Sequence, residues 1–127
     1  MSIRTLNINQ YSQVFNAEKN NKINFGEVHT DFTLIHKILD LLPKYLFADP
    51  TKKWLDPCCG KGYFTIVLYK RLFKSLLKSI PNDEERHNHI IKHMIYMVEL
   101  NSEHIPLLYK LFGENANILN DDFIIDQ

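Results

Sequence analysis

Residues 53–64 are Lys53-Trp54-Leu55-Asp56-Pro57-Cys58-Cys59-Gly60-Lys61-Gly62-Tyr63-Phe64. A short apolar run precedes Asp56-Pro57, and small residues and two glycines follow. This pattern is typical of a strand that is followed by a tight loop. From Gly62 to Ile80 the apolar residues recur at helical spacing, and Pro81 ends that pattern. The segment therefore predicts a strand, a glycine-rich turn and a helix, in that order.

The same order is repeated further along the chain. Asn82, followed by three acidic residues, has the side chain and the charges that favour a helix start. A short run that is apolar at every position, as in a buried parallel strand, comes next. These patterns predict helices over 82–93 and 102–112 and strands over 95–98 and 117–120. Alternating strands and helices predict an α/β fold with a parallel sheet.

Before this region, Thr30 or Asp31 can cap a helix whose apolar face runs from Phe32 to Leu42. Residues 1–24 are polar and rich in asparagine, which predicts a loose lead-in with one short helix near 10–18. The length of 127 residues fits one domain. We therefore expect a lead-in over 1–24 and one domain over 25–127.

Composition narrows the classes of protein to which the chain can belong. Lysine plus arginine and aspartate plus glutamate number 15 each, so a strongly cationic nucleic-acid-binding body is excluded. The two cysteines are adjacent, so they cannot form a disulfide framework, and they lack the spacing of a metal site. This cysteine usage is typical of a protein in a reducing compartment. No targeting segment or membrane-length apolar run is found in the sequence. We expect a soluble, intracellular, cytoplasmic protein without a metal.

Acidic residues follow all three predicted strands: Asp56, Glu99 and the pair Asp121-Asp122. Ligands of open parallel sheets bind outside the carboxyl ends of the strands. These acids should therefore gather along one edge of the sheet, near the glycine-rich turn. We call this group of four residues the acidic rim.

The residues around the glycines decide between kinds of ligand. A P-loop needs a lysine and then serine or threonine after the last glycine, but Lys61 precedes Gly62. The third glycine of a dinucleotide fingerprint would fall at Thr65. Asp56 would also repel a pyrophosphate and attract a cation. Glu99 is placed to accept hydrogen bonds from ribose hydroxyls, so the pattern favours an adenosine ligand that is cationic elsewhere.

At these residues the chain resembles the S-adenosylmethionine-dependent N6-adenine DNA methyltransferases of restriction–modification systems, phages and large viruses. Residues 56–64 are similar to that family's Asp-Pro-Ala-Cys-Gly-Ser-Gly-Asn-Phe motif, and residues 26–31, Gly-Glu-Val-His-Thr-Asp, are similar to its Gly-Glu-Val-Phe-Thr-Pro segment. Residues 120–123, Asn-Asp-Asp-Phe, resemble the segment beside the adenine ring. The resemblance implies a Rossmann-like methyltransferase fold with S-adenosylmethionine as cofactor.

The resemblance also assigns expected contacts to individual residues. Thr30 would contact the methionine moiety, and Glu99 would accept from the ribose. Asp122, with Asp121 as the fallback, would accept from the adenine amino group, and Phe123 would lie beside the ring. The full expected cofactor-binding set is Thr30, Asp56, Cys58, Gly60, Gly62, Glu99, Asp122 and Phe123.

The family's catalytic signature, Asn/Asp-Pro-Pro-Tyr/Phe, holds the flipped adenine and does not occur in these 127 residues. We therefore assign no catalytic residue and expect the chain to be the amino-terminal part of a methyltransferase. DNA would be bound through other parts of the protein, which a second chain could carry. Two alternatives remain open: a non-catalytic S-adenosylmethionine-binding module, and a methyltransferase that acts on RNA or protein.

Each pattern also has a simpler explanation. The glycines could form an ordinary turn, and an acid after a strand is often a solvated loop residue. His89 and His93 have the spacing of a metal-binding helix face, but the intervening glutamate of a zinc protease is missing. The basic residues Lys70, Arg71, Lys74 and Lys78 fit a solvated helix face better than a nucleic-acid patch.

Overall fold

The computed structural model describes residues 2–7 and 31–122. Strands β1 (Trp54–Asp56), β2 (Ile95–Val98) and β3 (Asn117–Leu119) form a parallel sheet in the order β1-β2-β3. Trp54 lies opposite Ile95, and Met97 lies opposite Ile118. The α/β class is confirmed: a small, open parallel sheet with flanking helices, consistent with a Rossmann-like fold.

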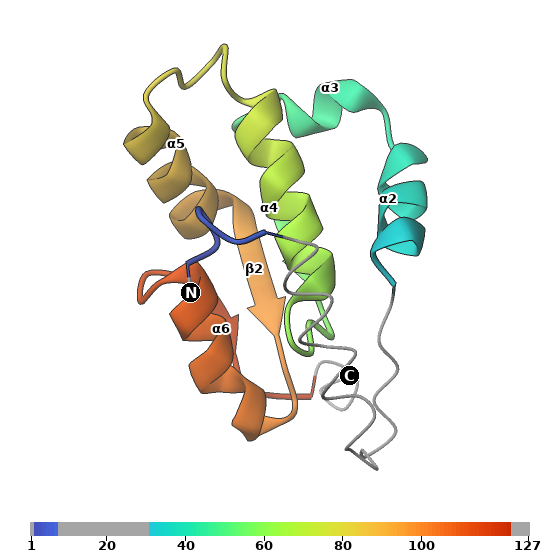
Figure 1. The fold of residues 1–127 in the computed structure, drawn as a ribbon, viewed down its shortest axis with the longest axis vertical. Coiled ribbons are helices and arrows are strands. Elements are labelled where there is room, and N and C mark those ends of the chain that lie inside the picture. The colour runs from blue at the N-terminus through green and yellow to red at the C-terminus, as the bar shows by residue number, and fades with distance from the viewer. Residues whose placement is uncertain (1, 8–30, 123–127) are drawn as a thin grey trace.

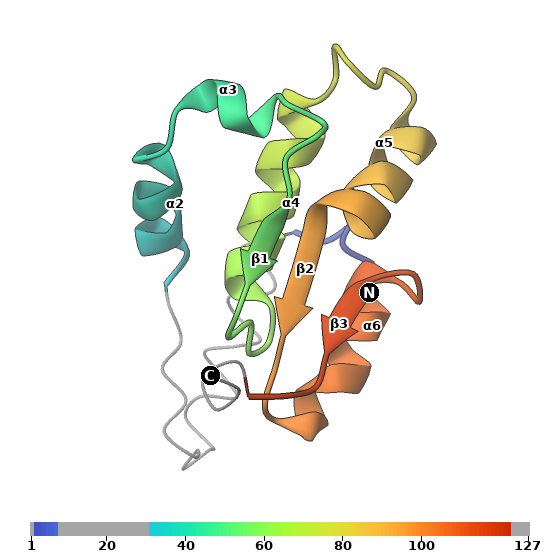
Figure 2. The same cartoon turned by 180° about the vertical axis from the view of Figure 1, so that it is seen from behind.

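The helices form a layer on one side of this sheet. In the order of the chain they are α2 (Phe32–Asp40), α3 (Lys44–Phe47), α4 (Tyr63–Ser75), α5 (Asp83–His89), the π-helical turn η1 (Ile90–Met94), the 3₁₀ turn η2 (Ser102–His104) and α6 (Ile105–Phe112). Figures 1 and 2 show α4, α5 and α6 on the same face of the sheet, with α2 beside α4. Helical connections on one face are what consecutive parallel strands require when all the crossovers have the same hand.

The start of α2 agrees with the sequence prediction, and the end of α4 does not. Asp31, one of the two predicted caps, caps α2, because its Oδ1 accepts from the Thr33 amide at 2.7 Å. The predicted helix over 62–80 ends at Ser75, and Leu77 is 56% exposed although the apolar pattern continues through it. The apolar periodicity therefore extends past the end of the hydrogen-bonded helix.

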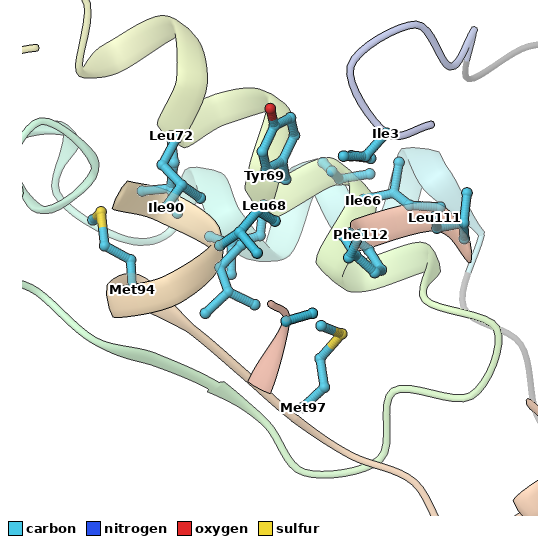
Figure 3. Close-up of a cluster of buried hydrophobic side chains, with 14 of the residues drawn as sticks. Ile3, Ile66, Leu68, Tyr69, Leu72, Ile90, Met94, Met97, Leu111 and Phe112 are labelled. Atoms are coloured by element: carbon cyan, nitrogen blue, oxygen red, sulfur yellow. The ribbon is translucent and has the colours of Figure 1, made fainter. Parts of the chain in front are cut away.

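The core lies between the helical layer and the sheet. Figure 3 shows side chains from α4, η1, β2 and α6 meeting there, including Ile66, Met94, Met97 and Phe112, all 2% exposed or less. Tyr69 and Leu72 of α4 are buried in the same cluster. Burial of these large apolar groups is the main source of stability for the sheet and its helices.

Ile3 and Leu6, in the segment 2–7, also belong to this core, although the sequence predicts a loose lead-in here. Ile3 is fully buried, and its amide donates to the Leu111 carbonyl at 2.8 Å. The Lys70 ammonium donates to the Ile3 carbonyl at 2.9 Å. Contacts with distant helices therefore fix this segment in a way that its local composition does not indicate. The helix predicted near 10–18 lies outside the described residues.

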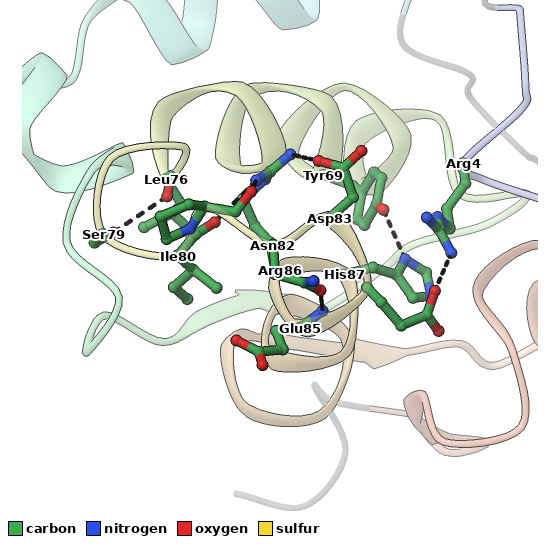
Figure 4. A network of polar contacts seen from close by, with 12 residues as sticks. Arg4, Tyr69, Leu76, Ser79, Ile80, Asn82, Asp83, Glu85, Arg86 and His87 are labelled. Carbon is green, nitrogen blue, oxygen red and sulfur yellow. Dashed lines mark hydrogen bonds and ion pairs between the residues drawn. The ribbon is translucent and has the colours of Figure 1, made fainter.

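A polar network joins α4 to α5 (Figure 4). The Arg86 guanidinium donates to the Ile80 carbonyl at 2.8 Å and to Asp83 Oδ1 at 2.6 Å, and it lies 4.0 Å from the centre of the Phe73 ring. Tyr69 and His87 contact each other at 2.7 Å between the hydroxyl and Nδ1. These contacts hold the connection between the two helices in place.

The opposite face of the sheet is open in the part of the chain that the structure describes. Figure 2 shows β1, β2 and β3 in front of the helices, and Leu55 and Leu119 are 52% and 56% exposed. Parallel sheets are usually covered on both faces, so exposed leucines here are unusual. Among residues 2–7 and 31–122, no helix is long and apolar enough to cross a membrane.

Candidate functional site

The turn after β1 is held against the end of β2. The Cys59 amide donates to the Val98 carbonyl at 3.0 Å, and the Gly62 amide donates to the Cys59 carbonyl at 2.8 Å. Gly60 and Gly62 both have left-handed backbone conformations, with φ of +55° and +88°. Only glycine adopts this conformation without strain, so the two glycines make the turn possible.

The two glycines differ in what surrounds them. Among residues 2–7 and 31–122, a Cβ atom added at Gly60 would meet no atom within 4 Å, whereas one at Gly62 would lie 3.2 Å from both Leu108 and Phe112 of α6. Gly62 therefore allows α6 to pack closely against the turn. Gly60 instead faces open space, which is where a ligand could approach the backbone.

Asp56 occupies the end of β1 and is tied to the helix that follows the turn. Its Oδ2 accepts from the Thr65 hydroxyl at 2.8 Å, and its Oδ1 accepts from the Cys58 amide at 3.4 Å. Burial raises the pKa of Asp56, these two hydrogen bonds partly offset that effect, and the charge of Glu99 raises the pKa further. Thr65, at the position where a dinucleotide fingerprint would have glycine, is thus the hydroxyl donor that fixes Asp56.

The adjacent cysteines have different environments: Cys58 is exposed and Cys59 is buried. Burial raises the pKa of the Cys59 thiol, and the charges of Asp56 and Glu99 raise it further. A thiol with a raised pKa stays protonated and is a poor nucleophile. Cys59 is therefore a small core residue of the turn, while a ligand contact at Cys58 stays a prediction.

Glu99 follows β2 and is only 7% exposed. Its Oε2 lies 2.5 Å from Nδ1 of His104, which is 6% exposed, and its Oε1 accepts from the Leu100 amide at 3.0 Å. The backbone is fixed as well, because the Glu99 amide donates to the Leu119 carbonyl and the Asn120 side chain donates to the Glu99 carbonyl. Glu99 is therefore held in one orientation at the end of the strand.

The residues after β3 complete the described part of the rim. The Asp121 amide donates to the Glu99 carbonyl at 3.1 Å, and the Asp122 amide donates to Asp121 Oδ1 at 2.8 Å. These bonds place the Asp121-Asp122 backbone beside the end of β2. Thr30 and Phe123 lie outside the described residues, so their contacts stay predictions.

Sequence analysis does not identify two residues at this edge. His104 contacts Glu99, and an acid followed five positions later by a histidine at a helix start is the signal that could have indicated it. Leu100, directly after Glu99, is 65% exposed. An exposed leucine between a strand-ending acid and a helix start offers an apolar surface to a flat ring.

Together these features suit a cationic ligand better than a phosphate-bearing one. Asp56 and Glu99 lie close enough for the charge of one to raise the pKa of the other, and a cationic ligand would relieve that repulsion. Gly60 leaves open space, and Leu100 supplies apolar surface.

The other candidate patterns take part in structural contacts. His89 Nε2 lies 2.7 Å from the Pro50 carbonyl, and the rings of His89 and His93 are 5.5 Å apart between centres. Arg71 donates to Asp40 at 2.6 Å, and Lys70 contacts residues 2–7 as described above. Over residues 2–7 and 31–122, no group of three or more histidine, cysteine, aspartate or glutamate side chains could hold a metal ion.

Comparison with known proteins gives one informative similarity. No family model matches the chain. A protein of Mycoplasma pneumoniae named uncharacterized adenine-specific methylase is 36% identical over 93 residues. The match covers 66% of this chain and 22% of that protein, so the chain corresponds to only a small part of its relative's length. The similarity supports a relationship to methylases.

Proposed function

We propose that the chain binds S-adenosylmethionine as part of a methyltransferase, and that the whole enzyme methylates the N6 amino group of adenine in DNA. One observation carries the proposal: Asp56 and Glu99 lie at the carboxyl ends of adjacent strands beside Gly60, whose missing side chain leaves space that no described residue fills. The similarity to a protein named as an adenine-specific methylase supports it independently.

Each residue of the site has a defined role in this proposal. Asp56 attracts the cationic methionine end of the cofactor, and Glu99 accepts from the two ribose hydroxyls. Asp122 accepts from the adenine amino group, and Leu100 packs against the face of the ring. Thr30 and Phe123 complete the contacts at the methionine and adenine ends. A carboxylate accepts hydrogen bonds only, which suits hydroxyl, ammonium and amino donors.

The choice of methyl acceptor rests on the resemblance and on the relative's name. The tetrapeptide that would hold a flipped adenine is not among the 127 residues, so methyl transfer is proposed for the whole protein and cofactor binding for this chain. In-frame sequence after Gln127 that encodes Asn-Pro-Pro-Tyr or Asp-Pro-Pro-Tyr supports the enzyme. A stop codon directly after Gln127 would instead leave a cofactor-binding module.

The acceptor can be tested on such an extended protein. Radiolabelled S-adenosylmethionine is incubated with DNA, RNA and protein in parallel, and the product nucleosides are identified by mass spectrometry. We expect N6-methyladenine in DNA. Label only in RNA or in protein glutamine would retain the cofactor site and reject the DNA acceptor.

Cofactor binding by the chain itself is tested by isothermal titration calorimetry. We expect binding of S-adenosylmethionine but not of ATP, whose phosphates the acidic rim would repel. Glu99→Gln should weaken binding by at least tenfold, because it replaces one acceptor oxygen with a donor. Glu103→Gln, a change at an exposed acid nearby, is the matched control. A folded chain that binds ATP as well as S-adenosylmethionine, or neither ligand, would refute the proposal.

A further inference from the structure

We propose that His104 is a positioning residue that orients the Glu99 carboxylate toward the two ribose hydroxyls of the cofactor. This inference rests on the proposed function. In it, His104 contacts Glu99 and does not contact the ligand. It follows from the short contact between two buried groups, His104 Nδ1 and Glu99 Oε2, 2.5 Å apart.

The number of acceptor sites on the carboxylate sets what it can still bind. Each carboxylate oxygen has two lone-pair sites, and an ionised carboxylate has no proton to donate. Because an ionised carboxylate only accepts, the contact of Oε2 with His104 Nδ1 requires the tautomer that has its proton on Nδ1, and the Leu100 amide donates to Oε1. One site therefore stays available on each oxygen, which matches the two adjacent hydroxyls of a ribose.

Both partners of the contact are fixed by their own backbones. Asn101 Oδ1 accepts from the Glu103 amide at 3.0 Å, and the Asn101 carbonyl accepts from the His104 amide at 3.0 Å. This single turn, η2, leads directly into α6 and places His104 beside the end of β2. A glutamate held in this way does not have to be ordered when the ligand binds, and preorganisation of this kind increases affinity.

A purely structural role for His104 would be to pair a buried acid. Such a role predicts that its loss weakens every ligand equally. A positioning role predicts that the loss falls on the ribose hydroxyls alone. The two roles are therefore separated by comparing S-adenosylhomocysteine with its 2′-deoxy analogue.

The experiment measures Kd for both ligands with the full chain and three variants: His104→Ala, His104→Asn and His93→Ala. His104→Ala should weaken S-adenosylhomocysteine about tenfold and the 2′-deoxy analogue much less, so that the preference for ribose falls. The side-chain amide introduced by His104→Asn can replace the Nδ1 donor, so this variant should restore most of the preference. His93, which is exposed, should tolerate alanine without effect.

Imidazole NMR of the unaltered chain keeps the test valid if His104→Ala does not fold. The ¹⁵N spectrum should show a proton on His104 Nδ1 in the free protein, and an unprotonated Nδ1 would overturn the inference. Equal weakening of both ligands, or no change in either, would also overturn it. No binding of S-adenosylhomocysteine by the folded, unaltered chain would remove the proposed function, whereas binding with an unchanged ribose preference in the variants would remove only the role of His104.

Discussion

Replacing Gly60 and Gly62 separately by alanine should separate ligand binding from folding. Both residues have positive φ, so each alanine carries the strain of a left-handed backbone. Within the described part of the chain, the new methyl group also meets protein atoms only at Gly62, at 3.2 Å from Leu108 and Phe112. The same chemical change at two neighbouring positions should therefore have different effects.

The structure gives the expected size of each effect. A left-handed conformation costs an L-residue about 1–2 kcal/mol, so Gly60→Ala should destabilise the fold by about that amount. Overpacking adds about 1–3 kcal/mol, so Gly62→Ala should cost about 2–5 kcal/mol in total. At roughly 4 °C per kcal/mol for a domain of this size, the Tm should fall by about 4–8 °C and about 8–20 °C respectively.

Differential scanning fluorimetry measures the two Tm values, and calorimetry below the transition measures S-adenosylmethionine binding. Gly60→Ala should lose at least tenfold in affinity while it remains folded, because its methyl group occupies the space through which the ligand approaches. Gly60→Val should abolish binding. Unchanged affinity in folded Gly60→Ala, or a smaller loss of stability at Gly62 than at Gly60, would refute this explanation of the turn.

Three further predictions concern single residues. Asp56→Asn should weaken S-adenosylmethionine binding at least tenfold, whereas the Tm at neutral pH should stay the same or rise, because burial raises the pKa of Asp56 and so disfavours its charged form in the folded state. A large fall in Tm would indicate a structural role instead. Ile3→Ala should lower the free energy of unfolding by about 2–4 kcal/mol in urea titration, because a fully buried side chain is truncated, and a change near zero would show that residues 2–7 do not belong to the fold. Burial, with Arg4 nearby, lowers the pKa of His87, so the contribution of neutral His87 to stability is present above about pH 6.5 and is lost as the pH falls through the lowered pKa. His87→Gln should therefore reduce the slope of stability against pH in that acidic range, and an identical slope would contradict this explanation.

Local sequence patterns are sufficient to predict much of the fold. The second strand has the predicted bounds, Ile95–Val98, because a short run without charged residues suits a covered strand. Asn82 caps α5 through its side chain, which accepts from the Glu85 amide at 2.9 Å. Gly113 ends α6 with φ of +94°. Each of these features depends on residues that are close together in the chain.

The features that sequence analysis misses depend mainly on contacts between distant segments. The burial of Ile3 needs the position of Leu111, and the packing role of Gly62 needs the approach of α6. The short helix α3 is also not predicted, although it is a local feature. Pro43 ends the apolar pattern of the preceding helix, and it is also the residue directly before the first residue of α3. Spacing along the chain does not reveal long-range contacts before the fold is known.

The candidate site is predictable in part. The alternation of strands and helices predicts that Asp56 and Glu99 share one edge of the sheet, and the structure places them there. The alternation does not predict that both oxygens of Glu99 already have a partner, because that requires the orientation of His104. Position along a strand predicts which residues gather, but the side-chain geometry decides what they can still bind.

The most direct test of the account is to map S-adenosylmethionine onto the folded chain by amide NMR. The account predicts that the shifts concentrate at Cys58, Gly60, Leu100 and Asp122, at the carboxyl ends of the three strands. Amides of α5, on the far side of the core, should stay unchanged. No shifts at saturating ligand, or shifts confined to α5, would contradict the claim that this edge of the sheet is a cofactor site.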